Sequence, residues 1–120
     1  MLRTLAAATI AVVCLAATPG QADMNAAFGN TVLSRYADGG WVKHYFDADG
    51  SYRSRWSDGT NLTGRWRVQG SRVCLNNIRP RFLWIDSFCQ EMIDADVGDT
   101  WHSRDPLGRR VQNVLVAGRQ

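Results

Sequence analysis

The stretch that decides the fold covers residues 51–69 and reads SYRSRWSDGTNLTGRWRVQ. On each side of the Asp58-Gly59 pair, aromatic and aliphatic side chains alternate with arginines or other polar side chains. A strand points successive side chains to opposite faces, and Asp-Gly between two such runs is a strong hairpin signal. The stretch therefore predicts two antiparallel strands that share one apolar face and one basic face.

Similar turn signals recur along the chain at spacings of 11, 9 and 11 residues, which is typical of an all-β meander, sandwich or barrel. We expect about eight short antiparallel strands in a small barrel or strongly curled sheet, because closure removes exposed strand edges. A single helical turn is expected at 23–28 and a loop around Pro80 at 77–81. The expected strands cover residues 30–36, 41–46, 51–56, 61–69, 72–76, 82–92, 100–103 and 110–117.

The first 22 residues have the order of parts of a signal peptide. Arg3 is followed by an apolar run at 5–17, by the helix-breaking Pro19-Gly20, and by small residues before a cut after Ala22. The run is shorter than the roughly 20 apolar residues that cross a bilayer. We therefore expect a periplasmic or secreted protein, not membrane-spanning, with residues 23–120 as a single domain; an N-terminal helix packed on that domain is the alternative.

Two cysteines remain in such a mature chain, because Cys14 would leave with the signal peptide. Cys74 and Cys89 allow one intramolecular pair, and an oxidising compartment lets a disulfide persist. Two free thiols or a bridge between chains are the alternatives.

The basic face of the hairpin is the first candidate binding site. Arg53, Arg55, Arg65 and Arg67 fall on it, and the planar guanidinium suits phosphate and carboxylate groups. The sequence predicts a non-enzymatic binding module for an anionic small molecule or an envelope component; nucleic acid is not expected outside the cytoplasm. The alternative is that the acids among residues 86–105 neutralise these arginines.

The apolar face supports a different function. Tyr52, Trp56 and Trp66 share it, and an eight-stranded barrel has room inside for one small ligand. A lipocalin-like carrier with these three residues around a pocket is the second hypothesis.

A small hydrolase is the third hypothesis, with Glu91, Asp86, His44 or His102 as the titrating group. No nucleophile-elbow motif is present, and neither histidine has a second one at metal-ligand spacing. We therefore predict no catalytic set, no metal site and no cofactor.

Several segments also resemble a family of small exported β-rich proteins of Gram-negative proteobacteria. These segments are the Phe-Gly-Asn-Thr run at 28–31, the Gly-x-Trp at 64–66, the Cys-Leu pair at 74–75 and the Phe-Cys pair at 88–89. The resemblance implies a periplasmic location, a β-rich fold and the disulfide. It implies no reaction.

Overall fold

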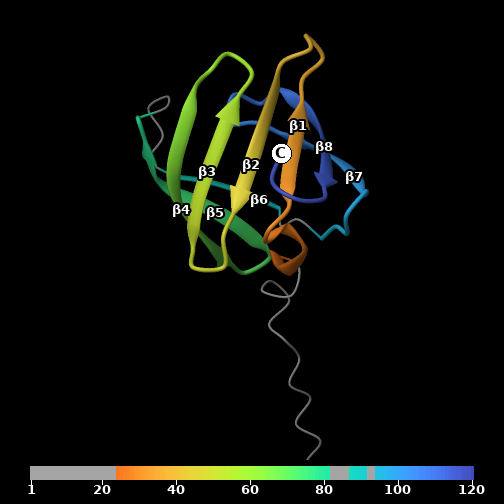
Figure 1. Ribbon diagram of the computed structural model, residues 1–120. Coiled ribbons are helices and arrows are strands. Elements are labelled where there is room, and N and C mark those ends of the chain that lie inside the picture. Colours follow the sequence, from red (N-terminus) through yellow and green to blue (C-terminus); the bar gives the residue numbers. More distant parts are fainter. Residues whose placement is uncertain (1–23, 82–86, 92–93) are drawn as a thin grey trace, which may run out of the picture.

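The computed structural model describes residues 24–81, 87–91 and 94–120; the expected signal peptide lies outside them. These residues form one antiparallel eight-stranded sheet that curls into a half-barrel, in the order β6-β5-β4-β3-β2-β1-β8-β7 (Figure 1). The predicted all-β class and curled meander are confirmed. The strands are β1 (Thr31–Arg35), β2 (Trp41–Phe46), β3 (Ser51–Trp56), β4 (Asn61–Gln69), β5 (Arg72–Arg79), β6 (Ser87–Glu91), β7 (Thr100–Arg104) and β8 (Arg110–Val116).

The three Asp-Gly turns explain why β2, β3 and β4 have the bounds expected from the sequence. Asp38, Asp49 and Asp58 each accept a hydrogen bond through Oδ1 from the backbone N–H two residues ahead, at 2.8–2.9 Å. The glycine after each aspartate has φ of 91°, 90° or 92°. A side chain strains that conformation, so Asp-Gly fixes both the turn and the strand register.

The end of β5 differs from the expectation of a loop at 77–81. Thr63 pairs with Arg79 and Arg65 pairs with Asn76, so β5 carries one extra residue opposite Gly64. Asn77 adopts φ of 51° at this bulge, a conformation that asparagine tolerates better than most residues. The bulge lets the strand continue to Arg79 and increases the local bend of the sheet.

The expected strand at 82–92 is observed in part. Residues 87–91 form β6, while 82–86 and 92 lie outside the described residues. The expected helical turn at 23–28 is a short 3-10 helix, η1 (Asn25–Ala27).

The concave face of the sheet holds the core. Alternation points Tyr52 and Leu62 inward and leaves Arg53 and Thr63 exposed, as the hairpin pattern predicted. The η1 segment lies at one end of the half-barrel (Figure 1), where Met24 and Ala27 are fully or almost fully buried. The core cluster comprises Met24, Ala27, Val32, Phe46, Tyr52, Leu62, Val73, Leu75, Ile78 and Leu115.

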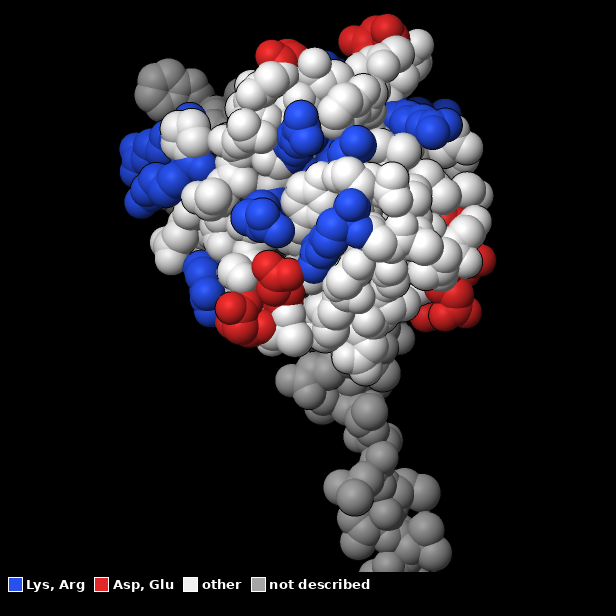
Figure 2. Space-filling model, in the orientation of Figure 1, with Lys and Arg blue, Asp and Glu red and all other residues white. Residues whose placement is uncertain are grey.

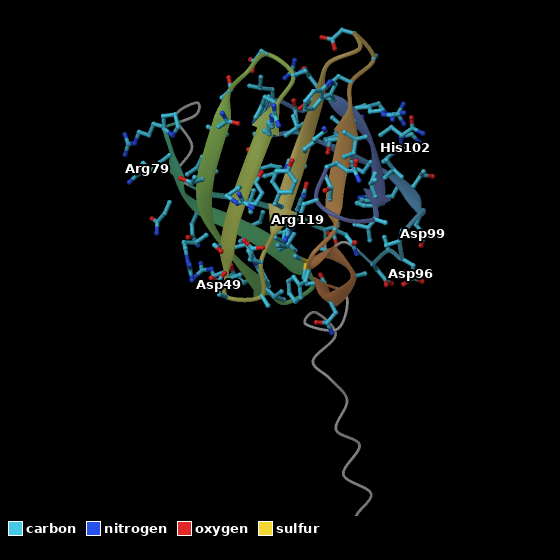
Figure 3. All side chains as sticks on the ribbon, viewed as in Figure 1. Asp49, Arg79, Asp96, Asp99, His102 and Arg119 are labelled. Carbon is cyan, nitrogen blue, oxygen red and sulfur yellow. A yellow bond between two sulfur atoms is a disulfide. The ribbon has the colours of Figure 1, made fainter. Side chains whose placement is uncertain are left out.

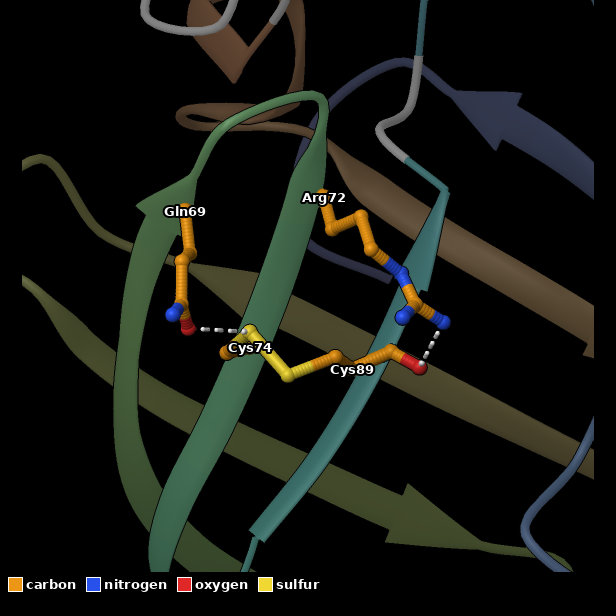
Figure 4. Close-up of a disulfide and its surroundings, with 4 residues drawn as sticks. All are labelled: Gln69, Arg72, Cys74 and Cys89. Carbon is orange, nitrogen blue, oxygen red and sulfur yellow. Dashed lines mark hydrogen bonds between the residues drawn. A yellow bond between two sulfur atoms is a disulfide. The ribbon is translucent and has the colours of Figure 1, made fainter.

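The Cys74–Cys89 disulfide joins two directly paired residues of β5 and β6 (Figure 4). Beside it, Arg72 Nη2 donates to the Cys89 carbonyl oxygen at 3.4 Å, and the Gln69 amide lies 3.6 Å from Cys74 Sγ. In the order of the sheet β6 is an edge strand. The disulfide therefore ties an edge of the half-barrel covalently to the strand next to it.

Replacing Gly64 with alanine tests the fit at the bulge. A Cβ there would lie 2.9 Å from the Asn76 carbonyl oxygen, which belongs to the backbone and cannot swing aside. We expect Gly64→Ala to lower the free energy of unfolding by about 1–3 kcal/mol, the usual cost of overpacking, in urea titrations. Asn77→Gly is the control, because glycine accepts the bulge conformation; a Gly64→Ala protein as stable as wild type would contradict this account.

Candidate functional site

The concave face of the sheet encloses a cavity of about 80 Å³. Its wall is mostly apolar, and it includes Phe88 and Gln90 from one edge strand and Trp101 and Ser103 from the other. Because β6 and β7 are the two ends of the strand order, the curl of the sheet brings both edges to one space. Tyr36, Asp105 and Pro106 extend the wall to the end that carries the β1–β2 and β7–β8 turns.

A row of polar side chains crosses the wall of this cavity. His44 Nδ1 lies 2.7 Å from the Tyr52 hydroxyl, and His44 Nε2 lies 3.1 Å from Ser34 Oγ. Ser34 Oγ donates to Asn113 Oδ1, and Asn113 Nδ2 donates to Ser103 Oγ at 2.9 Å. These five residues, which we call the polar row, come from the five neighbouring strands β3, β2, β1, β8 and β7.

The hydrogen bonds of the polar row run in one direction. Ser34 gives its hydroxyl proton to Asn113, so the His44 Nε2–H donates to Ser34 and the Tyr52 hydroxyl donates to His44 Nδ1. A serine nucleophile would need the opposite arrangement, with the imidazole accepting its proton. In this arrangement the row links five neighbouring strands, and a hydrogen-bond chain of one direction strengthens each of its members.

Burial controls the protonation of the row. It lowers the pKa of His44 to about 4, because the charged imidazolium loses solvation inside the sheet. The part of the ring that stays accessible faces the cavity. Burial also raises the pKa of the Tyr52 hydroxyl far above its ordinary value of 10. At neutral pH both groups are uncharged, so the cavity wall carries no charge at the row.

The three residues predicted to form an apolar pocket separate into two places. Tyr52 and Trp56 line the cavity. Trp66 packs instead against Phe28 and Phe46, with ring centroids at 5.6 and 6.3 Å, and its Nε1 donates to the Asp47 carbonyl oxygen. Trp66 therefore belongs to the closed end of the half-barrel and not to the cavity wall.

The residues considered for a hydrolase site do not lie together in the structure. His44 lies in the polar row, whereas His102 is exposed on β7 (Figure 3). Glu91 is exposed and pairs across the strands with Arg72, and Asp86 lies outside the described residues. The described residues bring none of these acids to the polar row.

The convex face carries the predicted arginines, but it does not hold them as one group. Arg53 and Arg55 line a shallow groove of about 380 Å³. Arg65 donates to the Asp49 carbonyl oxygen at 2.9 Å and so supports the β2–β3 turn, and Arg67 is exposed outside the groove lining. Their strand register explains the separation, because Arg53 lies opposite Thr63 and not opposite another arginine.

Two further basic residues lie near Arg53 and Arg55 on this face, and sequence reasoning missed both. Lys43 of β2 is the direct cross-strand partner of Arg55. Arg119 follows β8, and its side chain lies over the convex face near β2 and β3 (Figure 3). The alternation of β2 identifies Lys43, whereas no local pattern places Arg119 beside residues more than 60 positions earlier.

The acids expected to neutralise the arginines lie elsewhere. Asp96 and Asp99 are on the β7 side of the molecule (Figure 3), and Asp105 pairs with Arg109 at 2.9 Å. Of the described acids on or near the convex face, Asp47 pairs with Arg119 at 2.7 Å. The acids of 86–105 that the structure describes therefore leave Arg53 and Arg55 unneutralised.

The described part of the chain contains neither a metal-binding cluster nor a helix that could span a membrane. No group of three His, Cys, Asp or Glu side chains there is placed to hold a metal ion. Within residues 24–81, 87–91 and 94–120, helices are too short to cross a bilayer.

The low pKa of His44 predicts how stability depends on pH. The unfolded histidine binds a proton near pH 6.5, but the folded one does so only near pH 4. The unfolded state therefore gains protons first as pH falls, and up to about 3 kcal/mol of stability should be lost between pH 6.5 and 4. Urea titrations of wild type and His44→Gln across this range measure the difference. Equal pH dependence of the two proteins would contradict a buried neutral His44.

Comparison of the whole chain with protein-family models, curated proteins and solved structures finds no significant match. The resemblance to small exported proteobacterial proteins therefore stays a prediction. The cavity and the convex groove are the two features of the described residues that suggest a function.

Proposed function

We propose that the protein is a non-enzymatic carrier that binds one small, mainly apolar molecule in the cavity of the half-barrel. The observation that carries the proposal is the cavity itself, which side chains of all eight strands surround. Such a space is the usual ligand site of small eight-stranded barrels.

The size of the cavity limits the ligand. At about 80 Å³, it exceeds the roughly 10–15 Å³ that one water needs and is smaller than an engineered apolar cavity of about 150 Å³ that binds benzene. A short alkyl chain fits this space better than a large ring system. The remainder of such a molecule would lie at the turn end, beside Tyr36 and Pro106.

The polar groups of the wall limit the ligand further. The donors and acceptors of the polar row are largely engaged with one another, so they offer little to a strongly polar ligand. The Ser103 hydroxyl accepts from Asn113 and keeps its own proton for donation, and the Gln90 side chain makes no hydrogen bond to a described residue. One hydrogen-bonding group on an otherwise apolar ligand is the best match.

An export route fits this function and is proposed with it. The support is the signal-like order of residues 1–22 and a disulfide that an oxidising compartment preserves. An exported carrier can bind a ligand outside the cytoplasm, and that ligand does not have to cross the inner membrane.

Methyl NMR with neutral alcohols tests the cavity. Hexan-1-ol should shift the methyl signals of Val32, Leu62 and Ile78, which line the cavity, and should leave the Leu33 methyls of the convex face unmoved. Leu75→Trp should fill the space and weaken binding at least tenfold, and Leu62→Ala should enlarge it and admit a longer alcohol. Leu33→Phe is the control on the other face. Shifts spread over both faces, or unchanged binding in both cavity variants, would reject the proposal.

Mass spectrometry of protein expressed with its full chain tests the export route. The denatured mass should correspond to residues 23–120 minus two hydrogens for the disulfide. Under native conditions, an additional mass that leaves on denaturation would identify the class of natural ligand. A denatured mass that retains residues 1–22 in a membrane-free extract would contradict cleavage after Ala22.

A further inference from the structure

We propose that the groove on the convex face is a second binding site, separate from the cavity, and that it binds a phosphate group between Arg53, Arg55 and Arg119. The two sites use opposite faces of the same strands, since Tyr52 and Ser54 point inward while Arg53 and Arg55 point outward. The groove can therefore bind its ligand whether the cavity is filled or empty.

The first argument is that no carboxylate of the described residues neutralises the positive charge of Arg53 and Arg55. Lys43 lies directly opposite Arg55, and like charges at paired positions destabilise a sheet. Neither Arg53 nor Arg55 forms an ion pair with a carboxylate of the described residues. Figure 2 shows basic side chains gathered over β2 and β3, with acidic ones at the margin of the face. A bound anion would relieve this repulsion.

The second argument is the way Tyr45 holds two guanidinium groups. Tyr45 is 9% exposed although it belongs to the convex face, and its hydroxyl donates to a main-chain oxygen of Gln120. The guanidinium carbons of Arg53 and Arg119 lie 5.4 and 5.3 Å from the ring centroid. A guanidinium group has five N–H donors, so contact with the ring leaves donors for a ligand.

Arg119 has additional anchors that fix its position. Its Nη2 donates to the Phe46 carbonyl oxygen at 3.0 Å and to Asp47 Oδ1 at 2.7 Å. The segment around it is also attached to β1, because Thr31 Oγ1 donates to the Gly118 carbonyl oxygen and accepts from the Gln120 N–H. A cation held in this way loses little freedom when it binds an anion.

The lining of the groove points to phosphate. Asn61 and Thr63 join the three arginines along the groove, so hydroxyl and amide donors stand beside the charged ones. A phosphate oxyanion has several acceptor oxygens and more than one charge, and pairs of guanidinium forks match it well. The groove of about 380 Å³ has room for a phosphate ester as well as for the inorganic ion.

Arginine side-chain NMR at fixed ionic strength tests the site with inorganic phosphate. The Nε–Hε signals of Arg53, Arg55 and Arg119 should shift in a saturable way. Arg53→Gln/Arg55→Gln should weaken binding at least tenfold. The matched control is Arg67→Gln/Arg110→Gln, which removes the same charge from exposed positions outside the groove and should bind as wild type does.

Two outcomes would overturn the proposal. One is the absence of saturable shifts in the wild-type protein. The other is an equal loss of binding in both double variants, which would reflect net charge alone. Thermal melting of each variant checks that the fold is kept. Neither outcome affects the proposal of ligand binding in the cavity. The alcohol titration tests that proposal separately, through side chains of the opposite face.

A second measurement identifies the source of the phosphate. Sedimentation with phosphatidylcholine vesicles, with and without phosphatidylglycerol, distinguishes a lipid headgroup from a soluble phosphate compound. Retention on the phosphatidylglycerol vesicles that the Arg53→Gln/Arg55→Gln protein loses assigns the groove to a lipid headgroup. Saturable phosphate binding without retention assigns it to a soluble phosphate compound.

Discussion

The structure depends on one constraint: a single sheet has to bury its own apolar face. In the described residues there is no second sheet, and the 3-10 helix η1 covers only one end of the sheet. The sheet meets the constraint by curling, and the bulge at Asn77 adds to the bend at the pairing of β4 with β5. The curl creates the cavity, so the candidate ligand site is a consequence of how the core is buried.

The curled sheet also has to satisfy the hydrogen-bonding groups that it buries, and the polar row does this. An inward position on each of five neighbouring strands carries a hydrogen-bonding side chain. Burying such groups without partners would cost free energy, but here each finds its partner on the next strand. The row also fixes strand register, because a slip of one residue would turn its members to the outside. Its geometry therefore supports the same curl that the apolar residues favour.

Much of the fold could be predicted from the sequence because its signals are local. Each Asp-Gly turn is specified by two adjacent residues, and the alternation of β3 and β4 is contained in 19 residues. The end of β5 was missed because Pro80 suggested a loop, while the bulge that carries the strand to Arg79 depends on the approach of Gly64. A local signal cannot report a contact with another strand.

The candidate sites were less predictable for the same reason. Trp66 alternates in phase with Tyr52, yet its position along the barrel places it against Phe28 at the closed end. The arginines looked like one stripe, but the register of β3 against β4 divides them. Arg119 reaches Tyr45 only because the chain after β8 returns across the convex face. The polar row joins residues from Ser34 to Asn113, and only the strand order makes them neighbours.

The disulfide has a consequence for the wall of the cavity. Phe88 and Gln90 of the cavity wall belong to β6, the edge strand that Cys74–Cys89 attaches to β5. Before oxidation this part of the wall is held by the pairing of a five-residue strand. In a reduced chain this part of the cavity wall would be held by strand pairing alone, and oxidation makes the attachment covalent. For the carrier proposed above, the disulfide would therefore link the shape of the ligand site to the redox state of its surroundings.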